Sequence, residues 1–171
     1  MADNLQVEIS PPKSRWMKLR FSSGSQQFEE DVTTSVYPFL EQLCDAIRVL
    51  HDGFIDEKFR LLIGAPECEL CLQAAAESSQ AVLRINLWPD RKRSVLVPEP
   101  SVFRFEGARQ DIVSPFVTAL RKLRACMSDA NFEREYGAPF PAAAYAKLMQ
   151  RAQWPELAQR GPFVRRGGCL L

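Results

Sequence analysis

The chain has 171 residues, a length at which one domain can bury a substantial hydrophobic core. Its 22 lysine and arginine residues almost balance its 21 aspartate and glutamate residues, which leaves a formal net charge of +1. A nucleic-acid-binding domain is expected to be strongly basic, and a membrane span needs about 20 consecutive apolar residues. Because the sequence has neither feature, we expect a globular domain whose partner is a protein or a small ligand, with no nucleic-acid or membrane partner.

The cysteines and the N-terminus indicate a compartment. The sequence has five cysteines, an odd number, and residues 1–10 are polar and alternating, with no basic region followed by an apolar core. We therefore expect no secretory signal, reduced thiols and a cytoplasmic location.

The first third of the chain predicts three strands and a helix. Apolar and polar residues alternate in three segments, as expected of half-buried strands: 5–9, 16–21 and 27–32. A helix is predicted from Ser35 to about His51, with Ser35 as its cap and Pro38 in its first turn. Its expected buried face contains Val36, Phe39, Leu40, Leu43, Ile47 and Leu50.

The middle of the chain predicts further strands. They cover residues 58–63, 67–75, 81–88, 94–97 and 102–106. The segment from Trp88 to Arg93 is expected to be an exposed loop, because it contains a proline and four charged residues.

Two more helices complete the prediction. One runs from about Asp111 or Ser114 to Met127, and the other from Ala142 to about Gln153. The pattern predicts an α+β fold, mainly an antiparallel sheet with two or three helices packed on one face. Residues 1–160 should form one domain, and residues 161–171 a loose C-terminal tail.

A short internal echo relates two segments. Val36-Tyr37-Pro38-Phe39 and Val113-Ser114-Pro115-Phe116 share a valine, a proline and a phenylalanine at an offset of 77 residues, since 113 − 36 = 77. The echo has two interpretations, either two related strand–helix units or the ordinary occurrence of proline before an apolar helix face. In both cases Phe39, Leu43, Phe116 and Leu120 are expected in one shared core.

The residues that could carry catalysis are few. Cys68 and Cys71 form a CxxC motif, but they lie in a predicted strand and have no further ligands at zinc spacing. His51 is the single histidine, and its place near a helix end is typical of a structural role. We therefore expect no enzymatic activity, no catalytic residues, no bound metal and no cofactor.

Two loops are the candidates for partner binding. The first contains Trp88, Asp90, Arg91, Lys92 and Arg93, although Trp88 could instead be a lid over the core. The second is a turn with Tyr136 and Phe140. Each combines an aromatic residue with a conformationally restricted proline, and loops on a rigid sheet often carry recognition.

Several segments together are similar to a known group of proteins. They are Trp16-Met17-Lys18-Leu19-Arg20-Phe21, the helix from Ser35 to Leu50, Gly64-Ala65-Pro66-Glu67-Cys68-Glu69-Leu70, the second helix and Phe132-Glu133-Arg134-Glu135-Tyr136-Gly137-Ala138-Pro139-Phe140-Pro141. Over residues 15–150 the chain resembles a loose group of small, mostly uncharacterised bacterial α+β proteins, some of which resemble immunity proteins. The resemblance implies stoichiometric binding to a toxin encoded nearby and brings no catalytic residue with it. The alternative function is a small-ligand-binding or regulatory module.

Overall fold

A computed structural model describes residues 4–53, 55–62, 67–75, 78–88 and 101–152. The fold is α+β with antiparallel strands, as the sequence predicts. The elements in chain order are β1 (Gln6–Ile9), β2 (Trp16–Ser23), β3 (Gln26–Thr33), α1 (Phe39–Asp52), β4 (Ile55–Leu62), β5 (Glu67–Ala74), β6 (Gln80–Trp88), β7 (Ser101–Ala108), α2 (Arg109–Cys126), α3 (Asp129–Tyr136) and α4 (Ala142–Ala152).

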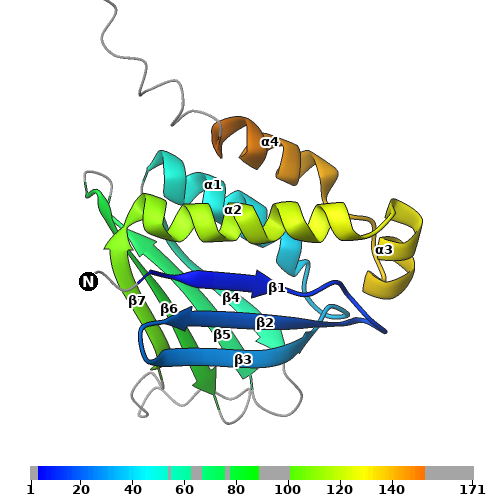
Figure 1. The fold of residues 1–171 in the computed structure, drawn as a ribbon, viewed down its shortest axis with the longest axis horizontal. Helices are drawn as coiled ribbons and strands as arrows, with labels where there is room; N and C mark the ends of the chain where they lie inside the picture. Colours follow the sequence, from blue (N-terminus) through cyan, green and yellow to red (C-terminus); the bar gives the residue numbers. More distant parts are fainter. Residues whose placement is uncertain (1–3, 54, 63–66, 76–77, 89–100, 153–171) are drawn as a thin grey trace, which may run out of the picture.

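The strands form two antiparallel parts that meet at one residue pair. β1, β2 and β3 make the first part, β4 to β7 make the second, and Thr33 on β3 pairs with Leu62 on β4. In Figure 1 the first three strands run across the view and the other four run obliquely to them. At the opposite end of β3, the side chain of Gln26 accepts a hydrogen bond from the backbone amide of Arg104 on β7, at 3.1 Å. β3 therefore contacts both outer strands of the second part, β4 and β7.

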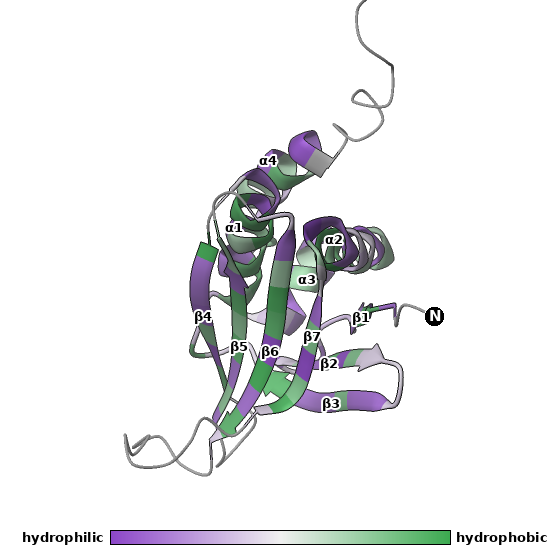
Figure 2. Cartoon of the chain, turned by 90° about the vertical axis from the view of Figure 1, so that its left-hand side faces the viewer, coloured by the Kyte–Doolittle hydropathy of each residue, from purple (hydrophilic) through white to green (hydrophobic). Residues whose placement is uncertain are grey.

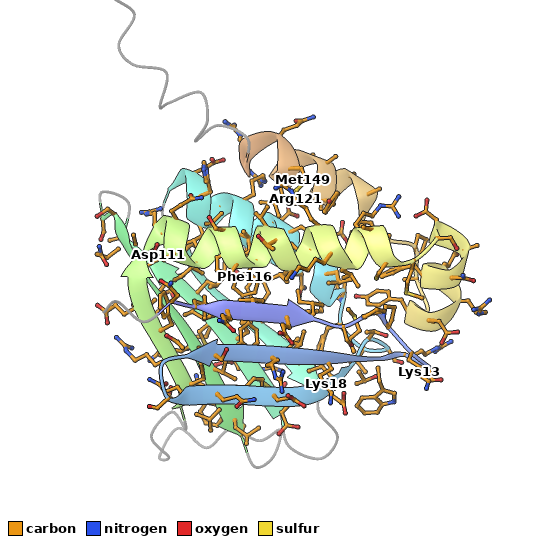
Figure 3. All side chains as sticks on the ribbon, in the orientation of Figure 1. Lys13, Lys18, Asp111, Phe116, Arg121 and Met149 are labelled. Carbon is orange, nitrogen blue, oxygen red and sulfur yellow. The ribbon has the colours of Figure 1, made fainter. Side chains whose placement is uncertain are left out.

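The helices lie on one side of the strands (Figures 1 and 2). α1 packs on β4 and β5, α2 packs along β1, and α4 packs on α1. Phe39, Leu43, Phe116 and Leu120 belong to one core and are at most 2% exposed, which confirms the predicted shared core. Phe116 lies between α2 and the strands (Figure 3). Within the described residues, none of the helices combines the length and apolar character needed to cross a membrane.

The structure corrects one predicted helix start and adds one helix that was not predicted. α1 begins at Phe39 and not at Ser35, and its N-cap is Pro38, without a side-chain cap bond. The sequence prediction also missed α3, whose eight residues bury only Phe132 and Tyr136, too few to show a helical period. The predicted strand at 94–97 and the predicted tail at 161–171 fall outside the described residues.

α3 is delimited by two local signals. The Ser128 hydroxyl accepts a hydrogen bond from the amide of Asn131 at 3.4 Å, as an N-cap does. Gly137 ends the helix with a left-handed φ of 89°, which glycine adopts without steric cost. This ending turns the chain toward the segment that connects α3 to α4.

Candidate functional site

A groove of about 480 Å³ lies between two connecting segments of the chain. One wall is the link between β3 and α1, residues 34–38, and the other is the link between α3 and α4, residues 137–141. Arg15, Leu40, Glu41 and Tyr136 complete the lining. Segments about 100 residues apart in the sequence therefore meet at one surface hollow.

Hydrogen bonds fix the two walls to each other. The hydroxyl of Thr34 donates to the carbonyl oxygen of Tyr136 at 2.8 Å, and the amide of Thr34 donates to the carbonyl oxygen of Arg15 at 2.9 Å. The amide of Arg15 donates in turn to the carbonyl oxygen of Glu135 at 2.7 Å. Backbone groups joined in this way form a rigid frame, because each group that loses water gains a partner.

The aromatic residues of the site belong to the frame. Tyr136 is 5% exposed, stacks on Phe132 with ring centroids 4.9 Å apart, and accepts a hydrogen bond from the amide of Leu40 at 3.5 Å through its hydroxyl. Burial raises the pKa of Tyr136, so its phenol is neutral at physiological pH. Phe140 is 8% exposed and packs edge-on against Phe132 and Tyr145. Tyr136 and Phe140, which the sequence analysis selected as contact residues, both line the groove and shape its floor and walls.

The exposed side chains at the groove come from residues that the sequence prediction did not select. Among the described residues, three large apolar side chains are strongly exposed: Val36 at 54%, Val102 at 46% and Trp16 at 42%. Val36 lines the groove, and Trp16 directly follows Arg15, which also lines it. Val36 was expected on the buried face of a helix, but the helix begins only after it.

Arg15 is held over the groove by an unusual backbone. Its φ is 66° and that of Ser14 is 50°, both in the left-handed region that non-glycine residues rarely adopt. The side chain of Arg15 lies against Gly137, where an added Cβ would be 3.3 Å from its Nε. We call Arg15, Val36, Tyr136 and Phe140, which all line the groove, the groove patch.

The other predicted binding loop does not join this patch. Trp88 is the last residue of β6 and is 8% exposed, the same exposed fraction as Phe140. In both Figure 1 and Figure 2, β6 ends far from α3, which carries Tyr136. Asp90, Arg91, Lys92 and Arg93 lie outside the described residues.

The CxxC motif lies on β5 with its two thiols on opposite faces. Cys68 belongs to the main core, whereas Cys71 donates a hydrogen bond to Glu69 at 3.5 Å. Asn86 on β6 donates to the same carboxylate oxygen at 3.3 Å. Burial raises the pKa of both Cys68 and Cys71 to about 12, so both are neutral thiols at neutral pH and neither is an activated nucleophile. The described part of the chain contains no group of three or more side chains that could hold a metal ion.

The single histidine belongs to a charged cluster at the end of α1. Its Nδ1 is 3.1 Å from the Oδ1 atom of Asp52. The carboxylate of Asp52 also lies 4.0 Å from Arg48 and 3.6 Å from Arg151, which joins the end of α4 to the end of α1. His51 therefore lies in an ion-pair cluster at the ends of α1 and α4.

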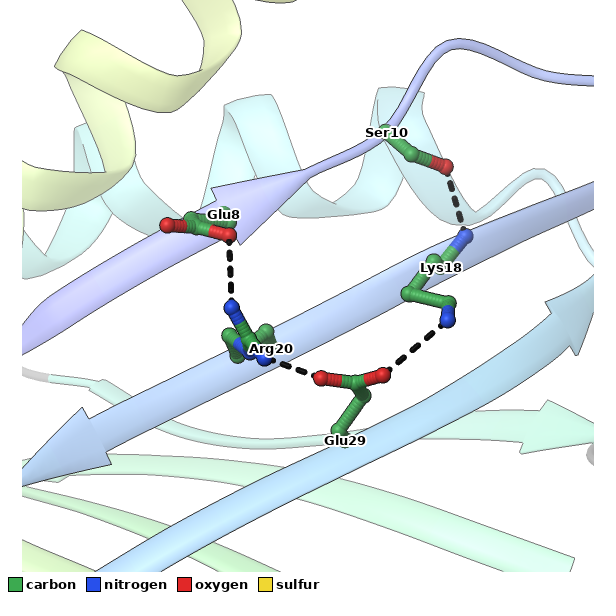
Figure 4. Close-up of polar contacts among 5 residues, drawn as sticks. All are labelled: Glu8, Ser10, Lys18, Arg20 and Glu29. Atoms are coloured by element: carbon green, nitrogen blue, oxygen red, sulfur yellow. Dashed lines mark hydrogen bonds and ion pairs between the residues drawn. The ribbon is translucent and has the colours of Figure 1, made fainter.

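The outer face of β1–β3 carries a self-paired charge network (Figure 4). Glu29 accepts hydrogen bonds from Lys18 at 3.0 Å and from Arg20 at 2.7 Å, and Arg20 also lies 3.6 Å from Glu8. The hydrogen bond from Lys18 holds the pKa of Glu29 below its usual range. Since the cations and anions of this network are paired with each other, the face offers no net charge to a ligand.

Four of the five cysteines are described and are unpaired: Cys44, Cys68, Cys71 and Cys126. Cys169 lies outside the described residues.

No family model, curated protein or solved structure matches the chain. The groove patch is therefore defined by its geometry alone.

Proposed function

We propose that this protein acts by stoichiometric binding to another protein through the groove patch. The observation that carries the proposal is the position of Val36, one of the three strongly exposed large apolar side chains of the described residues, in the wall of one groove. Exposed apolar groups at a surface hollow are typical of protein interaction sites. Arginine is also enriched among the residues that dominate binding energy, and the exposed Arg15 lines the same groove.

Immunity to a toxin is the most concrete form of this function. The proposal is supported by the resemblance of residues 15–150 to small bacterial proteins of which some are similar to immunity proteins. Two of the segments that carry the resemblance, Ser35–Leu50 and Phe132–Pro141, contribute residues to the groove patch. A neutralising protein needs a stable complementary surface and no catalytic group, and the rigid frame around Thr34 meets that requirement.

Binding of a small ligand is the second candidate function. The groove volume of about 480 Å³ falls within the range of small-molecule sites, roughly 300–1,000 Å³. Its lining combines aromatic and aliphatic side chains with Arg15 and Glu41, the usual composition of such sites.

Co-expression with the product of the adjacent gene tests the first proposal. The expected result is relief of toxicity and a one-to-one complex that buries on the order of 1,200–2,000 Å². Val36→Asp should weaken the complex by at least about tenfold, because it places a desolvated charge in the interface. Val102→Asp is the matched control, since Val102 is similarly exposed but lies on β7.

Two results would contradict the proposal. One is equal loss of binding in the Val36 and Val102 variants, which would place the contact elsewhere. The other is a wild-type protein that protects against no neighbouring toxin and binds a small molecule in the groove, which would favour the second candidate.

A further inference from the structure

Two unpaired charges of opposite sign line the groove between the β3–α1 and α3–α4 links. Among the described residues that line it, only Arg15 and Glu41 are charged, and both are exposed. Neither side chain forms an ion pair or a hydrogen bond within the described part of the chain, whether with the other or with a third residue. The groove is therefore neutral as a whole, and a ligand that carries both charges can pair with each of them.

The backbone of Arg15 is fixed from two sides. Glu135 accepts hydrogen bonds from the amide of Arg15 at 2.7 Å and, through its carboxylate, from the amide of Ser14 at 2.9 Å. The carbonyl oxygen of Arg15 accepts from both the amide and the hydroxyl of Thr34, at 2.9 Å and 3.1 Å. Left-handed backbone in non-glycine residues persists where the surroundings over-determine it, and it clusters at ligand clamps. The Arg15 side chain then lies over Gly137, which has no Cβ to displace it.

The side chain of Tyr136 separates the two charged residues. Its backbone end adjoins Gly137, over which Arg15 lies. Its hydroxyl accepts a hydrogen bond from the amide of Leu40, the residue before Glu41. Burial raises the pKa of this phenol, and the charge of Glu41 adds to the rise. Arg15 and Glu41 therefore flank opposite ends of one tyrosine side chain. A dipeptide spans a similar length, because an extended chain covers at most about 3.6 Å per residue.

The rest of the exposed lining is largely apolar. Val36 is 54% exposed, and Pro38, Ala138 and Pro139 are exposed lining residues as well. Covering such a surface with another apolar group is favourable, because it removes both from water. The site thus suits a small ligand with an apolar body and one charge at each end.

We propose that the groove binds short zwitterionic peptides with apolar side chains, with the terminal carboxylate on Arg15 and the terminal ammonium group on Glu41. A guanidinium binds a carboxylate through two parallel hydrogen bonds, and an ammonium group brings three donors to a glutamate. The inference develops the second candidate function of the groove and does not require toxin binding. An internal segment of a partner protein lacks both terminal charges, so this chemistry selects free peptides.

Calorimetric titration of the full-length protein with three peptides tests the ligand class. The peptides are the dipeptide valylvaline, its N-acetyl form and its C-terminal amide. Valylvaline is expected to bind, and each blocked form is expected to bind at least about tenfold more weakly, because it loses one charge-assisted contact.

Two variants assign the ends of the peptide. In Arg15→Gln, valylvaline and its amide should bind within about twofold of each other, because the partner of the carboxylate is gone. In Glu41→Gln, valylvaline and its N-acetyl form should do so for the corresponding reason. Arg104→Gln and Glu57→Gln make the same changes of charge at exposed residues that do not line the groove, and they should bind valylvaline within about twofold of wild type.

Three results would overturn the inference: valylvaline does not bind, the blocked peptides bind as tightly as the free one, or Arg15→Gln and Glu41→Gln weaken all three peptides equally. Each of them is distinct from failure of the proposed function, which is measured by complex formation with a partner protein. A partner complex that Val36→Asp weakens, together with no binding of valylvaline, would keep the proposed function and reject the peptide site.

Discussion

The segments Val36–Phe39 and Val113–Phe116 share three of four residues but differ in structure. Their phenylalanines are equally buried, with Phe39 at 2% and Phe116 at 0% exposure. Their valines differ in exposure, since Val36 is 54% exposed and Val113 is 1% exposed. The first segment is the open wall of a groove, and the second lies within α2.

The difference arises upstream of the shared residues. Asp111, whose carboxylate accepts a hydrogen bond from the amide of Ala108 at 3.2 Å, starts α2 well before Pro115. The position equivalent to Asp111 is Thr34, because 111 − 77 = 34, and the hydroxyl of Thr34 bonds to the carbonyl of Tyr136 instead. The chain before Pro38 is therefore held by α3 and forms no helix. A similar local sequence gives a helix interior in one place and the wall of a groove in the other, depending on the hydrogen-bond partner of the residue at the equivalent upstream position.

The largest effect on the free energy of unfolding should come from removing the buried phenylalanine that the two segments share. Phe116→Ala should lower the free energy of unfolding by about 3–5 kcal/mol, because it leaves a cavity in the core. Phe39→Ala should fall in the same range, as both rings are buried. Urea denaturation measures both losses, and a loss below about 1 kcal/mol for either variant would break the comparison.

Arg109 should have the next largest effect, since it anchors the start of α2. Its guanidinium donates to the carbonyl oxygens of Ser78 at 2.7 Å and Leu50 at 2.9 Å, and also to those of Gly53 and Ala75. Arg109→Met should cost about 2–4 kcal/mol, because it leaves several carbonyl groups without a donor. Arg104→Met, which removes an exposed ion pair with Glu106, should cost under about 0.5 kcal/mol in the same denaturation experiment. Equal costs for the two variants would refute the anchoring role.

Cysteines in the two helices allow a comparison by pH. Burial raises the pKa of Cys44 in α1 from 9.0 to about 12, whereas Cys126 at the end of α2 is exposed. Between these pH values the folded protein keeps a proton that the unfolded chain releases, so stability falls as pH rises. Cys44→Ala should make this fall shallower by about 1.4 kcal/mol per pH unit, measured by denaturation between pH 9 and pH 11. An unchanged slope in Cys44→Ala would contradict the buried environment of Cys44.

The smallest effect concerns the two prolines themselves. Pro115 lies inside α2 and cannot donate the hydrogen bond of a helix interior, whereas Pro38 is the N-cap of α1, where no such bond is required. Pro115→Ala should therefore stabilise the protein by about 1 kcal/mol, and Pro38→Ala should change stability by about 0.5 kcal/mol or less. Thermal melting measures both. A higher melting temperature for Pro38→Ala than for Pro115→Ala would reverse the expected order.

Much of the fold could be predicted because its signals are local. The strands with clean alternation, such as β2, and the apolar stripes of α1 and α2 follow from residue spacing. The core residues Phe39, Leu43, Phe116 and Leu120 were predicted for the same reason. α3 was missed because its ends depend on Ser128 and Gly137 and not on an apolar period.

The candidate site could be predicted only in part. Tyr136 and Phe140 were selected from their composition and do line the groove. Arg15 and Val36 were not selected, because their roles depend on hydrogen bonds between Thr34, Arg15 and Tyr136 that join distant segments. The one signal near Val36 of a later helix start is Pro38, because proline favours the first helical turn and disfavours a helical conformation in the residue before it.

The packing of α2 along β1 has a consequence for synthesis on the ribosome. The first three strands emerge early, and their inward side chains Met17, Leu19 and Phe21 are at most 1% exposed in the finished protein. The helix that lies beside β1 is translated about 100 residues later, which corresponds to roughly 5–20 s at ordinary elongation rates. During that interval the apolar side of the nascent sheet lacks the helix that covers it in the finished protein.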